Sequence, residues 1–187
     1  MAVVIFDPKE QRLLANCGGR FSEDENAMSL RVRRLFYVAK FAVVAVLGPS
    51  VNGYWIKDVL RAITMATARF EKTGVYEISL ERFDKGIAFN KDQTSFVVMT
   101  KKGLYEVSHE GVRLLDDSEL QSFGVLAGIF NVVYTKIPNI EKAIAYMEKT
   151  STFLGDRNMS YRREDCGDVM DLDSKDIFSS SFPVEGP

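Results

Sequence analysis

The fold is decided by residues 32–50, VRRLFYVAKFAVVAVLGPS, which hold two strand-like runs separated by Ala39-Lys40 and followed by Gly48-Pro49-Ser50. The runs, Val32 to Val38 and Phe41 to Leu47, are rich in β-branched and aromatic side chains, and this composition predicts a β-hairpin. The second run is wholly apolar, which is typical of a strand buried on both faces. We therefore expect a largely buried antiparallel sheet at the centre of the domain.

The chain before this hairpin predicts two more strands. Residues 2–6 form a short apolar run, and Asp7-Pro8-Lys9-Glu10 predicts a turn because proline fixes φ and donates no hydrogen bond. Residues 12–17 form the second strand, which Gly18-Gly19 ends. The polar stretch from Ser22 to Ser29 is predicted to be a loop.

The chain after the hairpin alternates between helices and strands. Apolar residues at three- and four-residue steps predict a helix that ends at Gly74, and a later helix that begins at Pro138 with Asn139 as its cap and closes at Gly155. Residues 75–93 are ambiguous: a short helix would suit Ile78, Phe83 and Ile87, but Gly86 weakens it. The remaining predicted elements are strands at 95–100, 104–108 and 112–115, a strand end leading into a helix at 123–135, and an edge strand at 158–163. This order predicts a layered α+β or αββα domain.

Length and composition limit the class of protein. The 187 residues are 46% apolar and 27% charged, which suits one globular domain, alone or with an appendage, and excludes a disordered or fibrous chain. The longest apolar run, Phe41 to Leu47, is far below the roughly 20 residues that span a bilayer. Because Asp7 to Glu10 interrupt the first apolar run, we expect no signal peptide and a cytoplasmic protein. The net charge of −2 gives no reason to expect nucleic acid or membrane as a partner.

The residues that could carry other chemistry are few. The two cysteines, Cys17 and Cys166, lie far apart, so they predict reduced thiols and no zinc site. His109 is the only histidine and stands in a polar turn, so it predicts a surface residue. Because the chain has no phosphate-binding glycine loop, we expect no cofactor and no metal.

Charge is concentrated at the end of the sequence. Residues 164–187 carry seven acids and one lysine, a net charge of −6, which leaves +4 on residues 1–163. We therefore expect a body over residues 1–163 and an acidic tail over 164–187. The tail is either mobile and solubilising, or docked on another subunit or partner through Ile177, Phe178 and Phe182. The basic cluster Arg31, Arg33, Arg34 and Lys40 is either an exposed strand face or a subunit contact.

The sequence resembles the β-type subunits of the proteasome, and most of all the proteasome-related heat-shock peptidase of bacteria. In that family a strand with two basic residues and leucine, an Ala/Gly-rich strand and a glycine turn precede the first helix at the spacing of residues 32–50. Residues 14–18, LANCG, match the family strand that ends in Asp-Gly or Asp-Ser. Over about residues 1–163 the resemblance implies a four-layer αββα sandwich of the N-terminal-nucleophile hydrolase type, a reduced second helix at 75–93, and a homo-oligomeric ring.

The catalytic positions implied by this resemblance are mostly changed. The family uses an amino-terminal threonine whose own amine is the general base, and Ala2 stands where that nucleophile is expected. The aspartate position falls on Cys17, the lysine position on Arg31, and the supporting serine near Leu126-Ala127. Gly48, at the oxyanion turn, is the element that is kept. Ordinary threonine-protease catalysis is therefore not expected.

Three interpretations remain open from the sequence. In the first, the chain is a catalytically inactive proteasome-like subunit that acts in homo-oligomeric assembly or partner binding. In the second, it is a peptidase or amidase of the same fold, silenced at Ala2 or using Cys17 beside the positive charge of Arg31. In the third, the resemblance is false and the chain is an unrelated α+β binding module.

Overall fold

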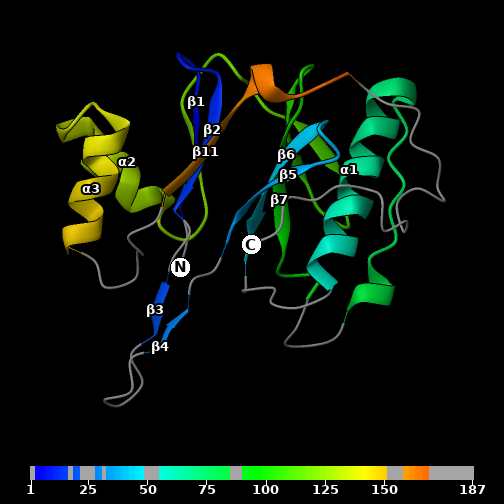
Figure 1. The fold of residues 1–187 in the computed structure, drawn as a ribbon, viewed down its shortest axis with the longest axis horizontal. Coiled ribbons are helices and arrows are strands. Elements are labelled where there is room, and N and C mark those ends of the chain that lie inside the picture. Colours follow the sequence, from blue (N-terminus) through cyan, green and yellow to red (C-terminus); the bar gives the residue numbers. More distant parts are fainter. Residues whose placement is uncertain are drawn as a thin grey trace.

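The computed structural model describes residues 3–16, 19–21, 28–30, 33–48, 55–84, 90–150 and 158–168. Two antiparallel sheets pack face to face, with α1 outside one sheet and α2 and α3 outside the other (Figure 1). The first sheet has the order β10-β1-β2-β11 and the second β5-β6-β7-β8-β9. The strands are β1 (Val4–Asp7), β2 (Arg12–Asn16), β5 (Leu35–Val38), β6 (Ala42–Leu47), β7 (Ser95–Met99), β8 (Leu104–Val107), β9 (Val112–Leu114), β10 (Gln121–Phe123) and β11 (Asn158–Arg162). The helices are α1 (Trp55–Thr73), α2 (Ala127–Lys136) and α3 (Ile140–Thr150).

Three apolar layers explain why the central strands are apolar on both faces. On β1, Val4 and Phe6 pack between the sheets, whereas Val3 and Ile5 face the core under α2 and α3. Strand β6 divides in the same way: Val43, Ala45 and Leu47 lie between the sheets, and Ala42, Val44 and Val46 lie under α1. Because side chains alternate between the two faces of a strand, each of these strands contributes residues to two cores. The predicted four-layer αββα sandwich is confirmed.

The decisive hairpin has the predicted two-residue turn. Ala39 and Lys40 both adopt the left-handed conformation, with φ of +56° and +53°, and the Phe41 amide donates to the Val38 carbonyl at 3.0 Å. Two successive left-handed residues match the right-handed twist of the flanking strands. The paired residues nearest the turn are Val38 and Ala42, so Phe41 also lies within the connection.

Residues 75–93 contain no second helix in the part that the structure describes. One turn of 3-10 helix, η1 (Glu81–Phe83), follows residues 75–80, which form neither a helix nor a strand. In this segment Tyr76, Ile78 and Leu80 pack on the α1 core, whereas Val75, Glu77 and Ser79 are exposed. The period of two is a strand-like signal, which sequence reasoning weighed only as a helix.

The polar stretch predicted as a loop is partly a strand. Residues 28–30 form β4 (Met28–Leu30), which pairs with β3 (Gly19–Phe21), so assigning Ser29 to a loop was wrong. The strand has three residues and follows a polar stretch, so it is too short to show a period.

The remaining predicted elements are found close to their expected places. Strand β11 lies at a sheet edge, and the Asn139 side chain caps α3 by accepting from the Lys142 amide at 2.9 Å. Gly155 and residues 169–187, including Ile177, Phe178 and Phe182, lie outside the described residues. None of the described helices is both long and apolar enough to cross a membrane.

Candidate functional site

The strand ends at one end of the sandwich come together. The backbone amide of Asn16, at the end of β2, donates to the Val3 carbonyl beside the start of β1, at 3.1 Å. Val4 of β1 and Leu47 of β6 share the core between the sheets. This end therefore gathers Gly48 and the chain neighbours of two predicted site residues. Those residues, Ala2 and Cys17, lie outside the described residues, as does Arg31.

Gly48 has a conformation that requires glycine. Its φ is +108°, and a Cβ built there would stand 2.3 Å from the Gln93 carbonyl oxygen. A side chain would thus meet both backbone strain and a fixed backbone atom. The glycine at the turn after β6 is dictated by close approach of the chain that leads into β7.

Arg34 is tied to this turn. Its side chain is 7% exposed, and Nη1 donates to the Gly48 carbonyl at 2.7 Å and to the Val46 carbonyl at 3.5 Å. A desolvated guanidinium is stable only with such acceptors, because burying an unpaired charge is costly. The contact places a permanent positive charge beside the glycine turn.

The two arginines proposed for a subunit contact use their donors within this chain. Arg34 is buried, so it offers almost no surface to a neighbour. Arg33 is half-buried, and it donates from Nε to the Leu35 carbonyl at 2.8 Å and from Nη2 to the Tyr161 hydroxyl at 3.1 Å. These bonds link the start of β5 to β11.

Asn16, the residue before Cys17, has a buried side-chain amide that sequence reasoning missed. Asn16 is 1% exposed, and its Nδ2 donates to Asn158 Oδ1 at 3.0 Å and to Glu148 Oε1 at 3.3 Å. These partners come from β11 and α3, more than 130 residues away, so no local pattern announces them. The end of β2 is thereby fixed to the helix layer.

The position expected for the supporting serine holds no hydroxyl. Leu126, 4% exposed, packs in the core under α2 and α3, where α2 begins. Leu126 and Ala127 carry no side-chain group that could donate or accept a hydrogen bond. At this position, therefore, the start of α2 offers apolar side chains in place of the serine hydroxyl that the family uses.

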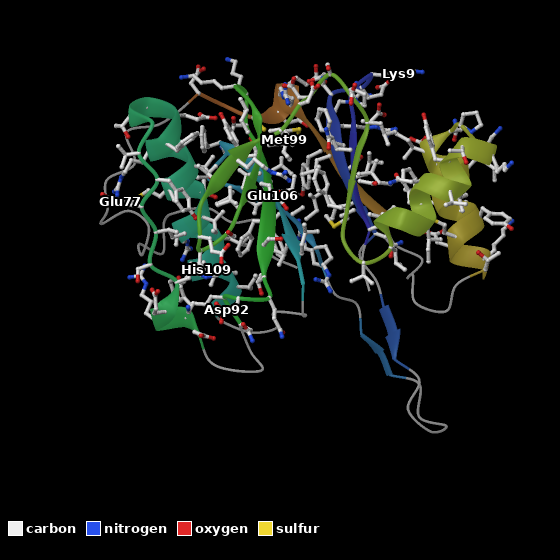
Figure 2. All side chains as sticks on the ribbon, turned by 180° about the vertical axis from the view of Figure 1, so that it is seen from behind. Lys9, Glu77, Asp92, Met99, Glu106 and His109 are labelled. Carbon is white, nitrogen blue, oxygen red and sulfur yellow. The ribbon has the colours of Figure 1, made fainter. Side chains whose placement is uncertain are left out.

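His109 gains a partner that sequence reasoning could not name. Its Nε2 lies 3.3 Å from Asp92 Oδ1, and Figure 2 shows the two side chains at one end of the five-stranded sheet. The antiparallel register of β7 and β8, with Phe96 opposite Val107, brings the residues before β7 to those after β8. His109 and Ser79 both line a surface groove, and the Ser79 hydroxyl donates to Glu81 Oε2 at 2.7 Å. Among the described residues no group of three acidic, histidine or cysteine side chains suits a metal ion.

Two antiparallel sheets between helix layers, with strand ends meeting at a glycine turn, define an αββα sandwich. The solved structure of eukaryotic HslV from Trypanosoma brucei is similar, with a TM-score of 0.52 and 9% identity over 86% of this chain and 98% of that chain. BPH of Thiobacillus denitrificans in complex with epoxomicin has a TM-score of 0.47 and 11% identity over 86% and 97% of the two chains. No protein-family model and no curated protein sequence matches the chain. The chain thus has a proteasome-like fold, as the sequence predicted.

Proposed function

We propose that the chain is a proteasome-like subunit that assembles with copies of itself and does not cut peptides by threonine chemistry. Its role is then assembly and the binding of partners. The observation that carries this proposal is an unpartnered apolar face on the α2 layer.

This face, here named the α2 stripe, consists of Val125, Ile129 and Val132. Their exposed fractions are 75%, 55% and 67%. A spacing of three residues puts Ile129 and Val132 on one side of α2, away from the fully buried Phe130, and Val125 lies in the turn just before the helix. A contiguous exposed apolar face is typical of a surface that another protein covers. The αββα sandwich leaves this helix layer on its outside (Figure 1), where a second copy has access.

The proposed loss of catalysis rests on side-chain chemistry. A methyl group at Ala2 cannot attack a carbonyl, and a nucleophile at the amino end is a requirement of this chemistry. The guanidinium of Arg31 keeps its proton at neutral pH, so it cannot exchange one as a lysine can.

The assembly part is tested with Ile129→Glu and Val132→Glu together. Size-exclusion chromatography with light scattering of the unchanged chain is expected to give a multiple of 21.1 kDa, and the double variant a smaller species. Leu114→Glu is the matched control, because Leu114 is 66% exposed on β9 of the other sheet. Equal masses for the double variant and the unchanged chain would exclude the α2 stripe as the interface.

The catalytic part is tested with casein and short fluorogenic peptides. The unchanged chain is expected to leave them intact. An Ala2→Thr variant whose Met1 has been removed is expected to stay silent as well, since the other positions differ too. Cleavage gained by that single change would instead identify a silenced peptidase.

A further inference from the structure

Three exposed lysines gather at the end of the sandwich opposite Gly48. Lys40 lies in the β5–β6 turn, and Lys101 and Lys102 lie in the β7–β8 turn. We name them the lysine end. The last described residues come to this place: the Gly167 amide donates to the Lys40 carbonyl at 2.9 Å, and Asp168 Oδ1 lies 3.1 Å from Lys101 Nζ.

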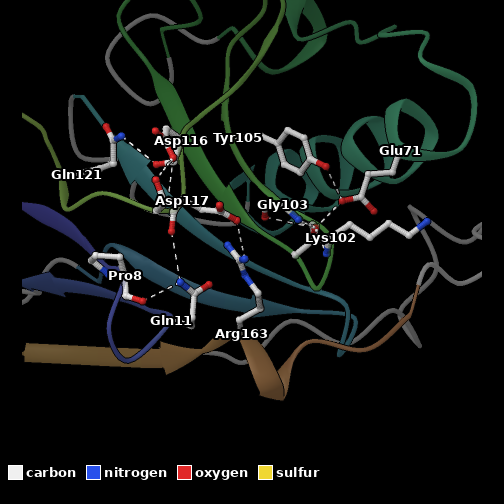
Figure 3. Close-up of polar contacts among 12 residues, drawn as sticks. Pro8, Gln11, Glu71, Lys102, Gly103, Tyr105, Asp116, Asp117, Gln121 and Arg163 are labelled. Atoms are coloured by element: carbon white, nitrogen blue, oxygen red, sulfur yellow. Dashed lines mark hydrogen bonds and ion pairs between the residues drawn. The ribbon is translucent and has the colours of Figure 1, made fainter.

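The chain is held firmly where it reaches the lysine end. Cys166 is 4% exposed and packs in the core between the sheets. Arg163 Nη1 donates to Asp117 Oδ2 at 2.7 Å, a contact that Figure 3 shows beside the β7–β8 turn. At Gly167 a Cβ would stand 2.8 Å from the Lys40 carbonyl oxygen, so the backbone passes in close contact. The described part of the chain therefore ends at the lysine end.

The sequence beyond Asp168 complements this surface in charge. Residues 169–187 contain four acids, Asp171, Asp173, Asp176 and Glu185, and one base, Lys175. Asp171 is three residues past Asp168, at most about 10 Å along an extended chain. The first acids of the tail can thus reach the lysines without crossing the molecule.

Exposed apolar side chains also lie near the lysine end. Leu114, 66% exposed, pairs with Tyr105, whose hydroxyl donates to Glu71 Oε1 in the last turns of α1 at 2.9 Å. Figure 3 shows Glu71 and Tyr105 close to Lys102. Val75, 48% exposed, follows the end of α1. They offer contacts to the apolar residues that alternate with acids in the tail.

We infer that residues 169–187 dock on the lysine end of their own chain. The occupant is the chain's own tail because residues 166–168 are already seated there, which gives the tail a high local concentration at this surface. The tail is then an intramolecular acidic ligand that covers a basic surface. This inference is independent of assembly through the α2 stripe, which lies on the other helix layer.

The test is the rate of trypsin cleavage after Lys175, the only lysine or arginine that follows Arg163. Release of residues 176–187 from the full chain is followed by mass spectrometry, and a synthetic peptide of residues 167–187 gives the unprotected rate. We expect slower cleavage in the full chain at low salt. Protection should fade at about 1 M salt, because exposed ion pairs are weak and screened.

Charge variants identify the surface. The triple variant K40E, K101E and K102E is expected to speed cleavage by about fivefold or more, since several weak pairs are lost together. The double variant D171N and D173N should also speed cleavage, because it removes the acidic partners on the tail. A control with the same charge change on α2 and α3, made of K136E, K142E and K149E, should leave the rate unchanged.

Each other outcome overturns the inference. Cleavage of the full chain as fast as the peptide would show an undocked tail. Protection that the lysine-end variants leave intact would place the tail on another surface. Protection that rises with protein concentration would assign the lysine end to the tail of a neighbouring copy.

Discussion

Replacing Gly48 with alanine should cost far more stability than its exposed position suggests. Two physical effects add at this site. A φ of +108° lies beyond the left-handed well that L-residues tolerate, and such strain costs about 1–3 kcal/mol. The added Cβ would also stand 2.3 Å from the Gln93 carbonyl oxygen, and displacing backbone in a packed region costs about 1–3 kcal/mol more. We therefore expect a loss of about 2–6 kcal/mol in the free energy of unfolding.

Two other glycines separate these effects. Gly74 has a φ of +72°, and a Cβ added there would meet no atom within 4 Å, so Gly74→Ala should cost about 1 kcal/mol from conformation alone. Gly111 has an ordinary φ and open space, so Gly111→Ala should change stability by less than about 0.5 kcal/mol. The difference between the Gly48 and Gly74 variants measures the contact with Gln93 together with the extra backbone strain at a φ of +108°.

The assay is urea unfolding followed by circular dichroism, with the three variants and the unchanged chain under one condition. The expected order of destabilisation is Gly48→Ala, then Gly74→Ala, then Gly111→Ala. A loss at Gly48 no larger than the loss at Gly74 would refute the close approach of the β6 turn to the chain before β7.

Three further predictions concern the core, an ion pair and a thiol. Phe130→Ala should lower the free energy of unfolding by about 3–5 kcal/mol, because the ring is fully buried under α2; a loss below about 1 kcal/mol in urea unfolding would contradict this packing. A hydrogen bond from Arg12 lowers the pKa of the exposed Glu141 carboxyl, so its stabilisation is present above the unfolded pKa and disappears as pH falls through the folded one. Glu141→Gln should cost about 0.5 kcal/mol at pH 7 and less as pH falls below the unfolded pKa of about 4.3, and a cost that does not change with pH would disprove the link. Burial raises the pKa of the Cys166 thiol to about 11, so in a Cys17→Ser background a thiol reagent at neutral pH should label it only after unfolding.

The two-faced strands could be predicted from sequence because both faces of each are buried. Strands β1 and β6 read as unbroken apolar runs, and each feeds two cores. The Ala39-Lys40 turn and the Asn139 cap could also be predicted, because each depends on residues that are neighbours in the sequence.

The features that were missed depend on partners far away in the chain. Arg33 and Arg34 are adjacent arginines, a pattern typical of a surface strand. Arg34 is nevertheless buried, because the Gly48 carbonyl, 14 residues later in the chain, accepts its hydrogen bond. The amide of Asn16 finds its partners on α3 and β11. The segment from Val75 to Leu80 did carry a local period of two in its burial, but a short helix was weighed there from the spacing of Ile78, Phe83 and Ile87 and from the resemblance.

The most direct test of the central claim is the native mass of the full chain. The proposal of a proteasome-like subunit that acts by assembly predicts a closed ring of six or more copies of the 21.1 kDa chain in native mass spectrometry. A single 21.1 kDa species at every protein concentration would contradict it.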